Sequence, residues 1–281
     1  MDYSFTKMHG LGNDFIVMRG TDAPPFSAEQ IRQLANRRTG IGFDQFLWLE
    51  PPRNSDNDVF YRIYNADGGE VEQCGNGARC IARLLAGEHP DPERIWEMEF
   101  DGGVISASLT PEGFVSLDMG VPSLEAADLP LDTSIAAMQS DGTYSVEVDG
   151  EAVSFRAISM GNPHAVLLSD DIDNAPVATL GPLLEHHDCF PNRANIGFMQ
   201  IVDEAHIRLR VFERGVGETQ ACGTGACAAV AAGQLAGLLA HEVQVDLPGG
   251  SVHVMWNGPD SSLWLTGEAI KVYEGTIEHT I

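Results

Sequence analysis

Short stretches in which apolar and polar residues alternate recur along the chain, and β-branched side chains are frequent in them. Such alternation is typical of strands that bury one face. Gly, Asp and Pro separate the stretches, as in LTPEGF and VDGEAV, and these residues favour tight turns. We therefore predict mainly antiparallel strands over residues 61–65, 104–109, 114–119, 144–148, 153–158, 207–212, 243–247 and 252–256.

One segment has a different pattern. Residues 223–239 carry Ala, Val, Leu and Cys on every face of the helix that they would form. A helix that is apolar all round must be buried. A buried helix packed against antiparallel strands predicts an α+β fold, in which a curved sheet surrounds a central helix.

The sequence also contains an internal repeat. The segments RIY, GE and CGNGA begin at residues 62, 69 and 74, and RVF, GE and CGTGA follow 148 residues later. GNDFIV at residue 12 resembles GNPHAV at residue 161, and IGF occurs at residues 41 and 196. We infer a domain duplication with pseudo-two-fold symmetry. The predicted halves are 1–120 joined by a returning segment 269–281, and 121–268, with the active site in the cleft between them.

Charge narrows the choice of partners. The chain has 41 acidic and 16 basic residues, for a net charge of −25, and its only lysines are Lys7 and Lys271. Nucleic acid is excluded as a partner because its binding needs a basic surface. The spread of acidic residues favours adaptation to high salt, where screening relieves self-repulsion, over an ordinary acidic protein.

Five cysteines and no export signal predict a cytoplasmic protein with free thiols. The start MDYSFTKMHG lacks the pattern of a signal peptide, and no apolar run approaches the roughly 18 residues of a membrane span. We therefore expect no membrane association.

Cys74 and Cys222 each follow a strand and a Gly-rich turn and precede a helix. Unpaired N–H groups and the helix dipole favour negative charge at that end. We therefore expect the pKa of each thiol to fall toward neutrality. We also expect the glycines to let a carboxylate or phosphate approach the N–H groups.

If the repeat brings the two helix starts face to face, two thiols flank one small anion. This geometry suits inversion at a carbon that bears a proton, because one thiolate removes the proton and the other thiol delivers one to the opposite face. No metal and no cofactor are expected: the cysteine spacings differ from those of zinc sites, and both lysines lie outside the Gly-rich motifs, away from the place a pyridoxal phosphate Schiff base would need. Alternatives are packing cysteines, zinc ligands, and a redox pair that forms a disulfide.

The chain resembles the diaminopimelate epimerase family over nearly its whole length. The motifs are KMHGLGNDF, GFDQ, NADGGEVEQCGNGARC, GNPHAV, NRANIGF, RVFERGVGETQACGTGAC and VYEG. The proline racemase and PhzF-like families share the two-domain plan but not this set. The resemblance implies a homodimeric epimerase of lysine biosynthesis that interconverts L,L- and meso-diaminopimelate without a cofactor.

The resemblance also implies residue roles. Cys222 takes the proton from the L,L isomer and Cys74 donates one, and the roles exchange in reverse. His164 and Glu213 tune the thiol pKa values, although His164 could be purely structural. Tyr273 is at a dimer-contact position, or is a core tyrosine. Substrate contacts come from Asn13, Gln45, Asn65, Gly75, Asn76, Asn162, Asn195, Glu213, Arg214, Gly223 and Thr224.

Cys80, Cys189 and Cys227 are expected to serve packing. Two other functions stay open from the residues alone. A racemase of another amino acid would share the cysteines but would not need Arg214 and the asparagines for a second carboxylate. A thiol-based redox sensor or an anion-binding module would need the cysteines without the distal residues.

Overall fold

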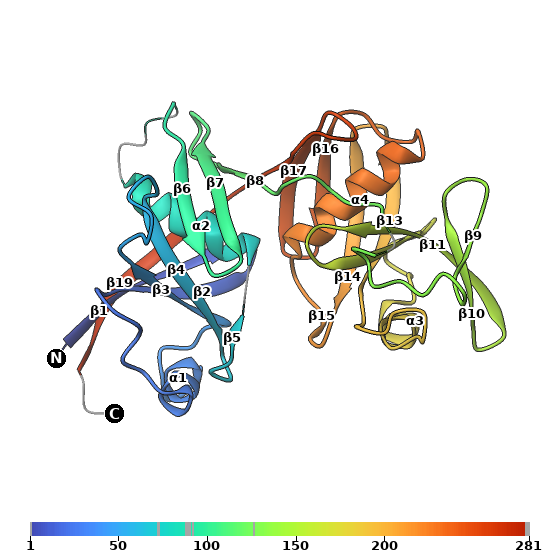
Figure 1. Cartoon of the computed structure of the whole chain (residues 1–281). Coiled ribbons are helices and arrows are strands. Elements are labelled where there is room, and N and C mark those ends of the chain that lie inside the picture. Colours follow the sequence, from blue (N-terminus) through green and yellow to red (C-terminus); the bar gives the residue numbers. More distant parts are fainter. Residues whose placement is uncertain (1, 72–73, 88–90, 92, 126, 279–281) are drawn as a thin grey trace. The chain divides into compact units, whose positions relative to one another are not determined.

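The computed structural model describes residues 2–71, 74–87, 91, 93–125 and 127–278. By its internal contacts the chain divides into two compact units. Unit 1 comprises Met1–Asp118 and Thr266–Ile281, and unit 2 comprises Met119–Leu265. The chain thus leaves the first unit once and returns to it at its C-terminal end, where strand β19 (Ile270–Glu278) pairs with β1 (Asp2–Gly10) (Figure 1).

Unit 1 is a mixed sheet with two helices. Its pairings give the strand order β19–β1–β2–β3–β4–β6–β7–β8, with the short β5 also against β4. The remaining elements are β2 (Asn13–Arg19), α1 (Ala28–Ala35), β3 (Gln45–Glu50), β4 (Val59–Asn65), β5 (Glu70–Val71), α2 (Gly75–Ala86), β6 (Trp96–Phe100), β7 (Gly103–Leu109) and β8 (Val115–Asp118).

Unit 2 repeats this plan. After the small hairpin of β9 (Ala137–Met138) and β10 (Tyr144–Val148), its elements follow in the same order as β1 to β8. They are β11 (Glu151–Ser159), β12 (Pro163–Leu168), α3 (Val177–Glu185), β13 (Asn195–Asp203), β14 (His206–Glu213), β15 (Gly217–Glu218), α4 (Gly223–Leu235), β16 (Glu242–Leu247), β17 (Gly250–Trp256) and β18 (Leu263–Gly267).

The strand pairings repeat as well. β2–β3 and β4–β6 are parallel in unit 1, and β12–β13 and β14–β16 are parallel in unit 2. A helix lies within each of these four connections, and a parallel pair needs such a crossover. The other repeated pairs are antiparallel, so the predicted α+β duplication is confirmed. The sheets are mainly antiparallel, as predicted, and these four pairs are the parallel exceptions.

The repeat also corrects one sequence match. β2 pairs with β3 through Phe15 and Gln45, and β12 pairs with β13 through His164 and Asn195. Gln45 and Asn195 are therefore equivalent. Residues 41–43 lie before β3, whereas residues 196–198 lie inside β13, so the two IGF segments do not correspond.

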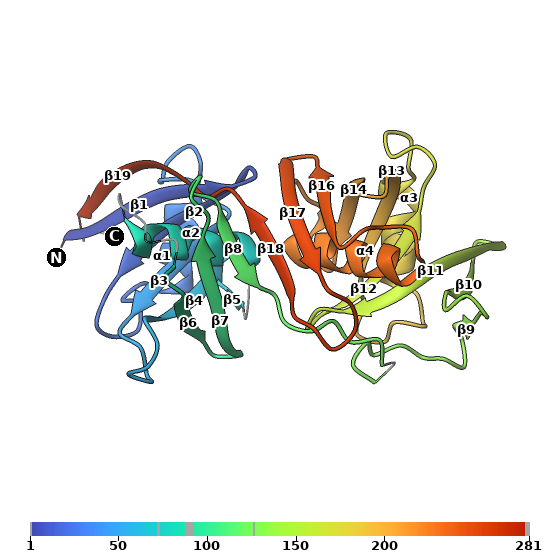
Figure 2. The ribbon, with the colours of Figure 1, turned by 90° about the horizontal axis from the view of Figure 1, so that it is seen from above.

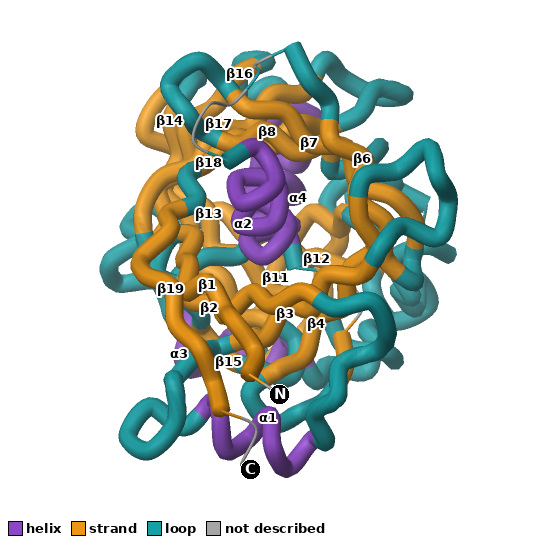
Figure 3. Tube along the Cα trace, turned by 90° about the vertical axis from the view of Figure 1, so that its left-hand side faces the viewer, coloured by secondary structure: helices purple, strands orange, loops and turns teal. Residues whose placement is uncertain are grey.

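A central helix lies against the sheet in each unit. Figure 3 shows α2 with strands around it, and α2 contacts β1, β7 and β8. Helix α4 lies against β11, β12, β13 and β17 (Figure 2), and residues 225–233 are all buried, as its apolar faces predict. Within the residues that the structure describes, no helix is long and apolar enough to cross a membrane.

Helix α4 ends earlier than its apolar pattern predicts. It stops at Leu235, four residues before the predicted end at Leu239. Gly237 has a φ of 71°, and the N–H of Leu238 donates to the carbonyl of Gly233. This left-handed glycine turn is a common helix end that apolar periodicity does not reveal.

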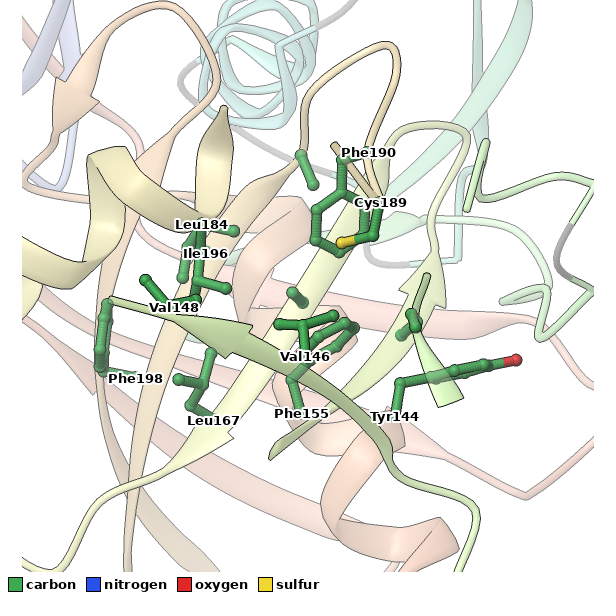
Figure 4. Packing of buried hydrophobic residues seen from close by; sticks show 14 of the residues in the cluster. Tyr144, Val146, Val148, Phe155, Leu167, Leu184, Cys189, Phe190, Ile196 and Phe198 are labelled. Carbon is green, nitrogen blue, oxygen red and sulfur yellow. The ribbon is translucent and has the colours of Figure 1, made fainter. Parts of the chain in front are cut away.

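The other helix of each unit, α1 or α3, covers the side of the sheet opposite to the central helix. In unit 1, α1 packs over a cluster rich in aromatic residues, among them Phe26, Phe46 and Trp48. In unit 2, Leu184 of α3 joins a cluster with Phe155, Ile196 and Phe198 (Figure 4). The inner strands β2, β3, β12 and β13 are therefore covered on both faces, whereas β7 and β17 alternate buried residues with more exposed ones.

Candidate active site

Cys74 and Cys222 are the N-cap residues of α2 and α4. Both have extended backbones, with φ of −145° and −121°, immediately before helical residues. This confirms the predicted position of both cysteines at a helix start. The first N–H groups of each helix, including those of Gly75 and Gly223, lack partners inside the helix and can receive an anion.

The second glycine of each motif has a packing role. A Cβ on Gly77 would lie 3.1 Å from Leu47 Cδ2, and a Cβ on Gly225 would lie 3.0 Å from Val211 Cγ2. Both contacts are tighter than ordinary van der Waals contact. Gly77 and Gly225 therefore let the helix lie close to the sheet. From the sequence, we expected these glycines to let a ligand approach the helix start.

In unit 1, asparagine side chains gather beside Cys74. Asn13 Oδ1 lies 3.8 Å from the Cys74 sulfur and accepts a hydrogen bond from Asn76 Nδ2 at 3.2 Å. At the adjoining ends of β3 and β4, Gln45 Nε2 donates to Asn65 Oδ1 at 2.9 Å. Cys74 is half-buried. Asn13, Asn76 and Cys74 thus form one contact group, and Gln45 and Asn65 form another.

In unit 2, a carboxylate faces the thiol. Cys222 Sγ donates to Glu213 Oε2 at 3.2 Å, and the Thr219 hydroxyl donates to Glu213 Oε1. Cys222 is only 4% exposed. Glu213 ends β14 as Asn65 ends β4, which agrees with their equivalence in the repeat.

The expected fall in the pKa of Cys222 is wrong for this structure. Burial raises the pKa of the Cys222 thiol well above its usual range, and the carboxylate of Glu213 adds to the rise. Burial also raises the pKa of Glu213, against the hydrogen bonds donated by Thr219 and Cys222. Loss of solvation outweighs the helix start here, because a charged group loses more on burial than the dipole returns.

His164 lies beside the site as a neutral ring. Its Nε2 is 3.0 Å from Asn162 Oδ1, and Asn162 Nδ2 donates to the Thr224 hydroxyl at 3.4 Å. Thr224 Oγ1 lies 3.7 Å from the Cys222 sulfur. Burial, aided by the charge of Arg214, lowers the pKa of His164 to about 3. His164 therefore reaches the thiol through Asn162 and Thr224.

Arg214 stands on the exposed turn after β14. Its backbone N–H donates to Asn195 Oδ1 at 3.0 Å, and Asn195 Nδ2 donates to the carbonyl of Pro163. The buried Glu185 at the end of α3 accepts the N–H of Gly215 at 2.7 Å. The turn that carries Arg214 is thus anchored at two points.

Several of these contact residues were missed by sequence reasoning. Glu185 lies outside every motif, so only the fold reveals it, whereas Thr219 was visible within RVFERGVGETQACGTGAC. Asp44 accepts from Asn13 Nδ2 at 3.1 Å and was visible within GFDQ. Cys80, Cys189 and Cys227 are completely buried, as expected for packing residues.

Tyr273 lies on β19 and is 44% exposed, with its ring edge-on to Phe5 at 5.9 Å. It is not the core tyrosine that the sequence left open.

Each unit therefore presents a thiol, a helix start and several amides at corresponding positions of the repeat. A thiol in this setting can exchange a proton with a carbon acid, and the N–H groups can stabilise negative charge on a carboxylate. Unit 2 adds a carboxylate that can take the proton from its own thiol.

The family model that matches the chain is described as diaminopimelate epimerase. It matches residues 5–125 and 156–272. The chain is 52% identical to the diaminopimelate epimerase of Azotobacter vinelandii over 274 residues, which is 97% of this chain and 98% of that protein. It is 51% identical to the diaminopimelate epimerase of Nitrosomonas eutropha, covering 99% of this chain and 100% of that protein. These matches confirm the resemblance.

Solved structures with little sequence identity share the fold. A hydroxyproline epimerase from Agrobacterium vitis superposes with a TM-score of 0.67 at 17% identity, covering 98% of this chain and 92% of that chain. A PhzF-family protein from Bacillus anthracis gives 0.66 at 16% identity, covering 99% of both chains. These likenesses support the α+β fold alone.

Proposed function

The chain belongs to the diaminopimelate epimerase family, and we propose that it is a cofactor-independent isomerase that interconverts L,L- and meso-2,6-diaminopimelate. The observation that carries the proposal is the thiol at the start of each of the two repeat-related helices. Membership of this family identifies diaminopimelate as the substrate. The product would serve lysine biosynthesis through diaminopimelate.

We propose that both thiols act on one α-carbon. In the L,L direction the Cys222 thiolate removes the α-proton, so that a C–H bond breaks and an S–H bond forms. The electron pair moves into the carboxylate as an enolate-like charge, which the helix starts stabilise. Cys74 then gives its proton to the opposite face. In the reverse direction the two thiols exchange roles.

Glu213 supplies a route to the Cys222 thiolate. The thiol already donates a hydrogen bond to its carboxylate at 3.2 Å. Burial raises the pKa of Glu213, so a proton on this carboxylate is less unfavourable than it would be in water. Transfer of the thiol proton to Glu213 leaves a thiolate ready to act as the base.

Two sets of groups would hold the substrate. The backbone N–H groups of Gly75, Asn76, Gly223 and Thr224 would bind the reacting carboxylate. The amino groups and the distal carboxylate would be held by Asn13, Gln45, Asn65, Asn162, Asn195, Glu213 and Arg214. The exposed guanidinium of Arg214 suits a bidentate contact with a carboxylate.

Exchange of the α-proton in deuterated water tests the function. With L,L-diaminopimelate, the wild type should incorporate deuterium at the α-carbon and form the meso isomer. Cys74→Ala and Cys222→Ala should each abolish inversion, because each removes one of the two proton carriers. A Cys80→Ala variant is the matched control, since Cys80 is buried in α2 and should leave inversion intact.

Full epimerisation by either site variant would refute the two-thiol mechanism. Inversion of L-proline in place of diaminopimelate would point to a racemase with another substrate. Insoluble variants at positions 74 and 222 alone would favour a packing role for those cysteines.

We also propose that the protein is a homodimer that forms through β19. Tyr273 and Val272 of this strand are 44% and 54% exposed, although both are large and apolar. Sedimentation velocity should give a particle of twice the mass of one chain, and Tyr273→Ala should shift it toward the single chain. A single-chain mass for the wild type would contradict this.

We further propose a cytoplasmic location and adaptation to high salt. All five cysteines are free thiols, which a reducing compartment preserves. The net charge of −25 supports the salt adaptation.

A further inference from the structure

Four side chains in unit 1 form a row in which each residue donates a hydrogen bond to the next. Arg79 Nη2 donates to Asn76 Oδ1 at 2.9 Å, and Asn76 Nδ2 donates to Asn13 Oδ1 at 3.2 Å. Asn13 Nδ2 then donates to Asp44 Oδ2 at 3.1 Å. Arg79 is completely buried and Asn76 is 5% exposed, so the first part of the row is shielded from water.

The two ends of the row decide the orientation of both amides. A guanidinium can only donate, and an ionised carboxylate can only accept. With Arg79 at one end and Asp44 at the other, each amide has one favourable orientation. If Asn13 were reversed, its oxygen would face the carboxylate of Asp44 and its NH2 group would face the NH2 group of Asn76.

We propose that Asp44 is a positioning residue that holds the amide of Asn13 with its oxygen toward the thiol of Cys74. The inference rests on the proposed function, in which Cys74 is the proton donor in the L,L direction. Asn13 Oδ1 lies 3.8 Å from the Cys74 sulfur and is placed to accept from it. An acceptor at this position favours the protonated thiol over the thiolate.

Asp44 is itself firmly held. Arg37 Nη2 donates to Asp44 Oδ1 at 2.7 Å, and the backbone N–H of Asp14 donates to Asp44 Oδ2 at 3.1 Å. Arg37 also binds both carboxylate oxygens of Asp14, which forms an ion pair with the buried Lys7. This network fixes the carboxylate that faces Asn13.

The equivalent residue of unit 2 has the opposite orientation. Asn162 Nδ2 faces the helix start, where it donates to Thr224, and its oxygen faces His164. His164 contacts the amide of Asn162 as Asp44 contacts that of Asn13, although by the strand pairings His164 is equivalent to Phe15. The amide orientation therefore differs between the two units. The two thiols also have different neighbours: the amide oxygen of Asn13 at Cys74, and the carboxylate of Glu213 at Cys222.

Other ionisable groups surround Cys74. Tyr61 on β4 is buried, and burial raises the pKa of its hydroxyl, with a smaller contribution from Cys74. Cys80 and Arg79 lie on α2 itself, and Asp14, Asp44, Arg37 and Lys7 act from the side of Asn13. A test must therefore separate the orientation of the amide from the charge of Asp44.

The test measures the pKa of the Cys74 thiol in a Cys222→Ser background. The other three cysteines are completely buried, so alkylation by iodoacetamide can be followed at Cys74 by mass spectrometry as a function of pH. Asp44→Asn replaces a group that can only accept by an amide that can also donate, so only Asn76 still holds the orientation of Asn13 and the reversed amide becomes more populated. The pKa of Cys74 should then fall by roughly one unit, because an acceptor is replaced by a donor.

A double-mutant cycle separates the two causes. Asn13→Ala alone should also lower the pKa of Cys74, and adding Asp44→Asn to it should change little further. An equal shift from Asp44→Asn in both backgrounds would show a simple charge effect and overturn the proposal. An unchanged pKa in Asn13→Ala would overturn it as well, even if Asp44→Asn failed to fold.

Asp58→Asn is the matched control. Asp58 is a partly buried carboxylate of the same unit that pairs with Arg94 at 2.7 Å, and its loss should leave the pKa of Cys74 unchanged. Alkylation needs no diaminopimelate. Failure of the orientation proposal can therefore be told from failure of the proposed function.

Discussion

The buried thiol of Cys222 donates a hydrogen bond to Glu213, which is half-buried. Cys74 is more exposed and faces a neutral amide oxygen. The two thiols therefore differ in what can take their proton. The neutral His164 is connected to the Cys222 thiol through Asn162, which donates a hydrogen bond to Thr224 beside the sulfur.

His164 should make the stability of the protein depend on pH. Its pKa is lowered to about 3 in the folded protein and is near 6.5 in the unfolded chain. Between these values the unfolded state binds one more proton, so the free energy of unfolding decreases as pH falls from about 6.5 toward 3, by up to about 1.4 kcal/mol per pH unit. Above pH 6.5 this contribution is fully present.

Urea unfolding between pH 7 and pH 4.5 measures this slope. His164→Gln should reduce it, even if the variant is less stable at pH 7. The control is the NMR titration of the His164 ring in the wild type, which should show no protonation in that range. A ring that titrates near pH 6.5 would contradict the assignment.

The strand–turn–helix segment that carries each cysteine is the element on which the site depends. β4 leads to α2 and β14 leads to α4, and each helix lies in the crossover to a parallel strand. The close approach of the helix to the sheet fixes the direction of its first N–H groups. Gly77 and Gly225 make that approach possible.

Gly225→Ala should therefore destabilise the protein. The added Cβ would lie 3.0 Å from Val211 Cγ2 and 3.2 Å from Cys222 Sγ, inside a buried helix. We expect a loss of about 1–3 kcal/mol in the free energy of unfolding, as for other overpacked cores, despite the better helix propensity of alanine. Urea unfolding measures the change.

Gly223→Ala is the control for this prediction. It lies in the same helix, and its Cβ would meet Leu265 Cδ1 at 3.7 Å, an ordinary contact. It should leave the free energy of unfolding nearly unchanged. Equal stability of the Gly225→Ala variant and the wild type would show that the close approach is not needed.

Across the whole molecule, acidic side chains outnumber basic ones by 41 to 16. Arg37 and Arg62 each contact more than one carboxylate: Arg62 lies within 3.4 Å of Glu50, Glu70 and Asp101. Such contacts offset only part of the repulsion, because the net charge remains −25. The remaining repulsion acts against the compact state.

Salt should therefore stabilise the protein. Raising potassium chloride from about 0.1 M to about 2 M shortens the screening length from about 10 Å to below about 3 Å, so repulsion between surface carboxylates is reduced. The urea midpoint of unfolding should rise with salt. Sucrose is the control, because it stabilises proteins by exclusion from their surface and does not screen charges. Salt should therefore raise the urea midpoint further when sucrose is already present. A midpoint that is highest in dilute buffer would contradict salt adaptation.

The sequence by itself determined the duplication, most of the strands and both helix starts with their cysteines. These features follow from local patterns: alternation for strands, apolar faces for α4, and a repeated Gly-rich turn for the N-caps. The parallel pairs and the correspondence of β3 with β13 could be identified only in the folded sheet, because register depends on residues that are distant in the sequence.

Only the tertiary structure decided the chemistry around each thiol. The pKa of Cys222 rises although a helix start alone would lower it, because burial and the carboxylate of Glu213 come from segments that fold over it. Thr219, Glu185 and Asp44 join the site for the same reason. Ionisation and amide orientation depend on what surrounds a group in space, and that environment is assembled only when distant segments pack together.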